Sequence, residues 1–275
     1  WSNLAPGFPD GVNWWNGVFS IVAMAPWAFI GFDCIPQSAE EYNFSHKKST
    51  KIMILAIFIA ALLYIAMCTV TATGLMPWQD LLALGQNWET GYVVRHTFGL
   101  IGLIFLGIAM FCAVVSGMNA FYISTSRLMY AMADEGSLPA VFKYLSPKHG
   151  TPRNAILFVM VMSLFAPWFG REVLNWIVDM TSVGAAIVFA YTTGSAAIMA
   201  RKVGDTRQVW IGILGCICSF FFLALLLIPG MPGYLSFQSR VILLVWIAVG
   251  FAFYWIIRKN YGEIQRKRKL SSRSK

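Results

Sequence analysis

Long apolar stretches alternate with short polar ones along almost the whole chain of 275 residues. A helix of about 20 residues crosses a hydrocarbon core of about 30 Å, so an apolar run of that length predicts a transmembrane span. Seven spans are predicted, at residues 14–34, 52–74, 98–123 with an extension to about 133, 154–169, 173–199, 209–228 and 241–257. The pattern indicates an all-α polytopic membrane protein.

Composition agrees with this class. Hydrophobic residues make up 58% of the chain and charged residues 12%, whereas soluble domains have about 45–50% apolar and about 25% charged residues. All five cysteines lie in apolar runs, where a free thiol behaves as a small hydrophobic group. Cys216 and Cys218 lack the nearby histidine or second cysteine pair that a zinc site requires. No disulfide framework, metal site or cofactor is predicted.

The net charge of +9 is distributed unevenly among the predicted loops. If the first span runs from outside to inside, the inner loops and the C-terminal segment carry all but three of the 21 Lys and Arg residues. The outer loops keep only Arg95, Arg171 and Arg240. By the positive-inside rule this asymmetry predicts a cytoplasmic C-terminus, so the charge indicates topology and not a nucleic-acid partner.

The chain divides into a transmembrane domain at residues 1–260 and a basic tail at residues 261–275. The tail is expected to be an unstructured topology signal, and electrostatic binding of anionic lipid head groups is the alternative. The chain begins at Trp1 without an initiator methionine or a signal peptide, so we expect the later part of a longer protein.

The first span contains a break, in the stretch PWAFIGFDCIPQSAEE at residues 26–41. Gly31 allows backbone conformations that other residues resist, and Pro36 suits the first turn of a new helix. In lipid, an unwound backbone survives only where it lines a cavity or packs inside protein. Two half-helices are predicted, with the carbonyl end of the first attracting a cation and the amide end of the second attracting an anion.

A simple kink is the alternative interpretation of this stretch, since Gly and Pro are frequent in transmembrane helices. Asp33 is expected either to contact a ligand or to act as the N-cap of a helix that begins at Cys34. One side chain can serve both purposes.

Two motifs together resemble the amino acid–polyamine–organocation permease superfamily. FIGFDCIPQSAEEYNFSHKKSTKIMI, residues 29–54, is similar to the sixth transmembrane helix of that family and the loop after it. STSRLMYAMADEGSLPAVFKYLSPKHGTPRNAI, residues 124–156, is similar to the eighth helix and its cytoplasmic loop. The resemblance covers residue 14 to about 257. It implies the LeuT-like inverted-repeat fold, in which this chain would contain helices six to twelve. Helices one to five of the same protein would then be the missing partner of this chain.

The resemblance also implies substrate-binding residues. Backbone carbonyls of Trp27, Ala28, Phe29 and Ile30 would bind the substrate ammonium, and Gly31 and Asp33 belong to the same break. Trp27 and Phe121 match aromatic residues that enclose the substrate in a family member. The coupling residues of the family fall outside this chain, so the resemblance does not assign proton or sodium coupling.

Other polar residues are candidates for the transport pathway or its gates. Asp179 should face the protein interior or water, because a charge facing lipid is costly. Thr181 either lines the pathway or bonds a carbonyl one turn back. Ser116 and Asn119 form a polar patch that serves either helix packing or the pathway. An inner salt bridge is expected between Arg127 or Lys143 and Glu40 or Glu41.

The leading hypothesis is a plasma-membrane permease that moves an amino acid, with a lean toward neutral ones, by alternating access. A seven-helix receptor is the alternative, because the span count fits. No enzyme is expected, since the chain lacks H-E-x-x-H, G-x-S-x-G and paired acids within a span. The lipid bilayer is the expected surrounding, and residues 1–275 alone are not expected to transport.

Overall fold

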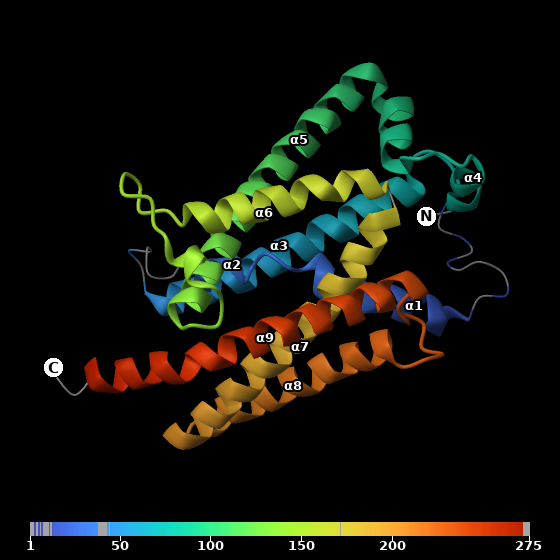
Figure 1. Ribbon diagram of the computed structural model, residues 1–275. Helices are drawn as coiled ribbons and strands as arrows, with labels where there is room; N and C mark the ends of the chain where they lie inside the picture. The colour runs from blue at the N-terminus through green and yellow to red at the C-terminus, as the bar shows by residue number, and fades with distance from the viewer. Residues whose placement is uncertain are drawn as a thin grey trace. The chain divides into compact units, whose positions relative to one another are not determined.

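Every regular element in the described part of the chain is helical (Figure 1). The computed structural model describes residues 3, 5, 7, 11, 13–37, 43, 45–170 and 172–271. The longer helices are α1 (Trp14–Ala28), α3 (His46–Thr73), α5 (Glu89–Asp134), α6 (Arg153–Phe165), α7 (Glu172–Val203), α8 (Thr206–Leu227) and α9 (Phe237–Ser271). The short ones are α2 (Cys34–Gln37), α4 (Trp78–Ala83) and the 3₁₀ helices η3 (Ala140–Lys143) and η4 (Ala166–Phe169).

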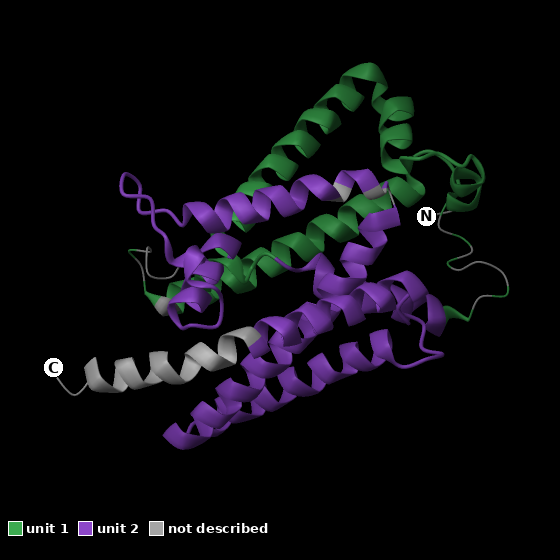
Figure 2. Ribbon diagram, viewed as in Figure 1, with its two compact units in different colours: residues 1–14, 31–124 green, residues 15–30, 125–275 purple. Residues whose placement is uncertain are grey.

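Two compact units divide the chain, and α1 and α5 each continue from one unit into the other (Figure 2). Unit 1 consists of residues 1–14 and 31–124, and unit 2 of residues 15–30 and 125–275. The chain passes between the units after Trp14, after Ile30 and after Ser124, and the second of these points lies inside the predicted break. Most of α1 therefore belongs to a different unit from α2.

Unit 1 contains α3 and the first part of α5, joined through their ends. The Thr71 and Thr90 hydroxyls lie 3.1 Å apart, and Gly74 lies beside Val93. Gly99, with φ +66° and ψ −160°, divides α5 into two straight pieces that meet at the bend visible in Figure 1. Only glycine adopts this conformation readily, so Gly99 explains the bend.

Unit 2 is built on the packing of α7 against α8. Gly212 and Gly215 of α8 lie against Ala197 and Thr193 of α7, which permits a close approach of the two backbones. A small apolar cluster completes the unit, and its buried members come from α1, α7, α8 and the segment before α9: Ala23, Val183, Leu225, Leu226 and Leu235. The core thus holds α1 on the same body as α7 and α8.

The predicted spans match the helices to different degrees. Five helices in the described chain, α3, α5, α7, α8 and α9, are long and apolar enough to cross a membrane. The spans predicted at 14–34 and 154–169 instead contain α1, of 15 residues, and α6, of 13 residues. Helix-breaking residues explain why these two helices are shorter than the predicted spans. α1 ends before Gly31, and α6 is followed by the 3₁₀ helix η4, which contains Pro167.

The C-terminal segment also differs from expectation. The helix α9 continues past residue 260 as far as Ser271, so this part of the tail is helical and not unstructured. Consecutive Lys and Arg residues are good helix formers, and a helix begun in the apolar segment extends through them at little cost. The division into a domain ending at 260 and a tail stays a prediction.

Candidate functional site

The end of α1 is where the predicted break lies. The last α-helical bond joins the Phe29 amide to the Ala25 carbonyl at 3.2 Å, and the Ile30 amide then turns to the Trp27 carbonyl at 3.1 Å. In a continuing helix the Ile30 amide would bond to Pro26. Among the described residues no backbone amide donates to the Pro26 carbonyl, and Pro26 itself is buried.

The turn that follows depends on Gly31 and Asp33. Gly31 has φ +128°, in the region that favours glycine, and its amide donates to Asp33 Oδ1 at 2.8 Å. The Cys34 amide then donates to the Gly31 carbonyl at 3.1 Å, where α2 begins. The bond described for the Asp33 carboxylate closes this turn, whereas the expected N-cap bond would run forward into α2.

The predicted binding residues on α1 differ in exposure. The Trp27 side chain is 43% exposed, while Ala28, Phe29, Ile30, Gly31 and Asp33 are half-buried. The candidates on α5, namely Ser116, Asn119 and Phe121, are exposed, and all three belong to unit 1. Trp27, by contrast, belongs to unit 2.

Asp179 faces protein, as the cost of an intramembrane charge predicts. Its Oδ2 accepts a hydrogen bond of 2.6 Å from the Ser239 hydroxyl, which is fully buried in the first turn of α9. The Thr181 hydroxyl donates to the Ile177 carbonyl one turn back at 2.6 Å. This bond is the second of the two alternatives given for Thr181 from the sequence. Asp179 therefore has its hydrogen-bond partner, Ser239, within unit 2.

The expected gate is described only in part. Lys143 Nζ lies 2.8 Å from Asp134 Oδ1, so its partner in the structure is an acid of its own loop region. Arg127 is half-buried in α5. Glu40 and Glu41 lie outside the described residues, and the pairing of either one with Arg127 stays a prediction.

Three residues of interest were not among the sequence-predicted sites: Ser239, Gln37 and Ser124. The Ser124 hydroxyl, on buried Ser124 of α5, donates to the Gln37 side-chain carbonyl at the end of α2. Ser124 opens the second motif, and Gln37 follows Pro36 in the first, so the two motifs meet through these side chains. Their presence in both motifs was the available signal; Ser239 offered none.

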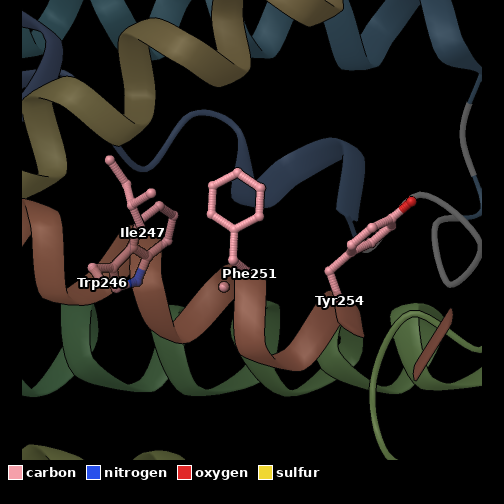
Figure 3. A pocket seen from close by; sticks show the side chains of 5 residues that line it. Trp246, Ile247, Phe251 and Tyr254 are labelled. Carbon is pink, nitrogen blue, oxygen red and sulfur yellow. The ribbon is translucent and has the colours of Figure 1, made fainter. Parts of the chain in front are cut away.

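An open apolar groove of about 370 Å³ lies on α9 (Figure 3). Its lining comes from one helix and consists of Trp246, Ile247, Gly250, Phe251 and Tyr254. None of these five described residues is charged. The five cysteines are free, and no cluster of three or more His, Cys, Asp or Glu side chains occurs among the described residues.

The sequence comparison decides the family. The sequence profile described as amino acid permease matches residues 1–257. The chain belongs to the amino acid permease family. This family lies within the amino acid–polyamine–organocation superfamily and implies the LeuT-like fold. Its members are transporters, so the chain is not that of an enzyme, and the receptor alternative loses its basis.

Relatives with curated descriptions cover most of this permease chain. The branched-chain amino acid permease BcaP of Bacillus subtilis is 25% identical over 96% of the chain and 55% of its own length. The methylthioribose transporter of the same organism is 27% identical over 96% and 55%. Cationic amino acid transporter 4 of Mus musculus is 28% identical over 72% and 30%. The permease chain thus spans about half the length of the two Bacillus subtilis relatives, and no solved structure matches it.

Proposed function

We propose that the protein to which this permease chain belongs is a secondary active transporter of amino acids or related organocations. The interruption of α1 before Gly31, in a chain of this family, is the observation that carries the proposal. Such breaks supply backbone groups to midplane substrate sites, around which the rest of the transporter moves in alternating access.

The substrate ammonium binds at the carbonyl end of α1. Carbonyl groups at a helix C-terminus carry partial negative charge, and the Pro26 carbonyl lacks the amide that a continuous helix would supply. Trp27, which is 43% exposed, closes over the bound cation through the face of its ring. The family resemblance also assigns Phe121 to substrate binding, and the polar character of Ser116, Asn119 and Thr181 makes them pathway candidates; these roles stay predictions.

The wider assignment rests on charge and length. Seven crossings, with the C-terminus in the cytoplasm of a plasma membrane, fit the placement of Lys and Arg in alternate loops. Helices one to five complete the site, which is consistent with relatives about twice as long as this chain. The small number of acidic residues near the break favours a neutral amino acid as the substrate.

Uptake by the complete protein in proteoliposomes tests this function. A panel of radiolabelled amino acids and polyamines identifies the substrate, and competition by its N-acetyl and methyl ester derivatives follows. The N-acetyl derivative should fail to compete, because it lacks the ammonium group. Equal competition by the N-acetyl derivative would disprove the ammonium site, and absence of uptake across the whole panel would disprove the transport function.

A glycine variant connects this function to the break. Gly31→Ala should lower uptake strongly, since alanine at φ +128° is strained. Gly107→Ala is the matched control, because Gly107 is exposed in α5 and a Cβ atom there meets nothing within 4 Å. Equal uptake by the two variants would show that transport does not depend on the break at Gly31.

A further inference from the structure

The segment between α8 and α9 contacts α1 directly. The Ser20 hydroxyl shares its proton between the Pro232 carbonyl at 2.9 Å and the Asn16 carbonyl of its own helix at 2.7 Å. Gly233 lies so close to α1 that a Cβ atom placed on it would stand 2.2 Å from the Ala23 Cβ atom. Ala23 is 1% exposed and belongs to the same apolar cluster as Leu235. Residues 232–235 therefore form a fitted seat for α1, and we call them the α1 seat.

The same stretch of chain continues to α7. Ser236 caps α9, because its hydroxyl accepts the Ser239 amide at 3.1 Å, and the two hydroxyls lie 2.8 Å apart. Ser239 then donates to Asp179 of α7 at 2.6 Å. A hydrogen bond to a carboxylate is roughly twice as strong as one between neutral groups. Within eight residues, the chain is bonded to both α1 and α7.

The α1 seat is fixed by its own contacts. The Leu235 amide donates to the Leu226 carbonyl at 3.1 Å, at the end of α8. Arg240 donates to the Tyr234 hydroxyl at 2.6 Å, and its guanidinium lies 4.8 Å from the centre of the Tyr234 ring. These contacts leave the seat little freedom to follow a displaced helix.

We propose that Gly233 and Asp179 are positioning residues for transport. Gly233 sets the depth at which α1 rests on the seat, and Asp179 holds the seat in place through Ser239. Neither residue touches the substrate. Both act on the placement of the carbonyl groups at the end of α1, and this role rests on the proposed function of that site.

A methyl exchange in the complete protein tests the role of Gly233. Gly233→Ala should raise KM for uptake about tenfold, since a shift of about 1 Å in a binding group is enough for such a loss. Adding Ala23→Gly removes the clashing methyl group and should return KM to within about twofold of the wild-type value. Gly250→Ala on α9, where a Cβ atom meets nothing within 4 Å, is the matched control.

Two outcomes would overturn this proposal: equal KM in Gly233→Ala and Gly250→Ala, or a double variant that remains as impaired as Gly233→Ala. If Gly233→Ala does not elute as a folded protein in size-exclusion chromatography, Ser20→Ala replaces it. Ser20→Ala deletes only the bond to Pro232 and a bond within α1. It should raise KM about threefold, and an unchanged KM counts against the seat.

Asp179 is tested by conservative replacement. Asp179→Asn keeps an oxygen acceptor for Ser239 and should retain transport within about threefold of wild type, whereas Asp179→Ala should raise KM about tenfold. Ser239→Ala should match Asp179→Ala. Loss of proton-driven accumulation in Asp179→Asn, with KM unchanged, would make Asp179 a proton carrier and overturn the positioning role.

A readout independent of transport separates this inference from the proposed function. A single cysteine replaces Ile30 in a background without the five native cysteines, and its alkylation rate reports the position of the end of α1. Gly233→Ala should change that rate severalfold, and the Ala23→Gly exchange should restore it. An unchanged rate overturns the positioning role even if transport occurs. A changed rate supports it even if no amino acid is transported.

Discussion

Gly212 of α8 lies directly against Ala197 of α7: a Cβ atom placed on Gly212 would stand 2.8 Å from the Ala197 Cβ atom. The same atom would also stand 2.8 Å from the Thr193 carbonyl oxygen. Real Cβ contacts are longer than this, so the two helices approach as closely as their backbones permit. The pair holds unit 2 together at its main helix contact.

Gly212→Val should therefore destabilise the protein. Forcing a larger side chain into a packed contact costs about 1–3 kcal/mol. Thermal unfolding of the detergent-solubilised protein, followed by size-exclusion chromatography, should show a fall of several degrees in Tm. Gly107→Val is the control, because a Cβ atom at Gly107 meets nothing within 4 Å. An equal Tm for both variants would contradict the described contact.

Substitution of Asp33 distinguishes a turn-forming residue from a charged ligand. Asp33→Asn retains an oxygen that accepts the Gly31 amide, and we expect it to keep most of the uptake. Asp33→Ala leaves that amide without its partner and should lower uptake several-fold, since such a loss costs about 1–3 kcal/mol if the amide stays shielded from water. Initial uptake rates provide the measurement. If Asn and Ala variants are equally impaired, the negative charge itself is required.

Trp27→Ala should weaken substrate binding while the fold is retained, because this side chain is already 43% exposed. A cation–π contact is worth about 0.5–2 kcal/mol, which corresponds to an increase in KM of about 2- to 30-fold. Trp27→Phe should lose less. Trp255→Ala, on a side chain that is 78% exposed in α9, is the control. An unchanged KM in Trp27→Ala would remove this residue from the site.

Charge reversal at the Lys143–Asp134 pair should alter stability only slightly. The two groups lie 2.8 Å apart, but their side chains are 42% and 48% exposed, so solvent screens the attraction. Exposed pairs contribute about 0–1 kcal/mol. Lys143→Glu alone should lower Tm by at most a few degrees, and addition of Asp134→Lys should restore it. If Lys143→Glu lowers uptake, and only an added charge reversal at Glu40 or Glu41 restores it, Lys143 belongs to the inner gate instead.

Much of the local structure follows from the sequence alone. Apolar runs and the positions of Gly31 and Pro36 act on the backbone over a few residues, so they predicted most of the long helices and the break in α1. The end of α5 has the same local cause. Gly136 has φ +83°, and the Ser137 and Gly136 amides bond back to Met132 and Ala133, which forms a Schellman motif.

The length of the helix before the break and the bend of α5 were harder to predict from the sequence. The apolar run at 14–34 predicted a full span, yet its apolar character cannot show where the backbone hydrogen bonds stop. Gly99 was one of several glycines in the third predicted span or beside it, and only its conformation distinguishes it from Gly102 and Gly107. All three are glycines in or beside the same apolar run, so the sequence does not show which of them bends the helix.

The sequence by itself determined the class of the protein, most of its long helices, its family and the position of the break. The tertiary structure alone decided that Ser20 bonds to Pro232, 212 positions away, and that Asp179 bonds to Ser239, 60 positions away. The physical reason is range. Helix formation and its interruption depend on neighbours within a few residues, whereas these partners are selected by how whole helices pack.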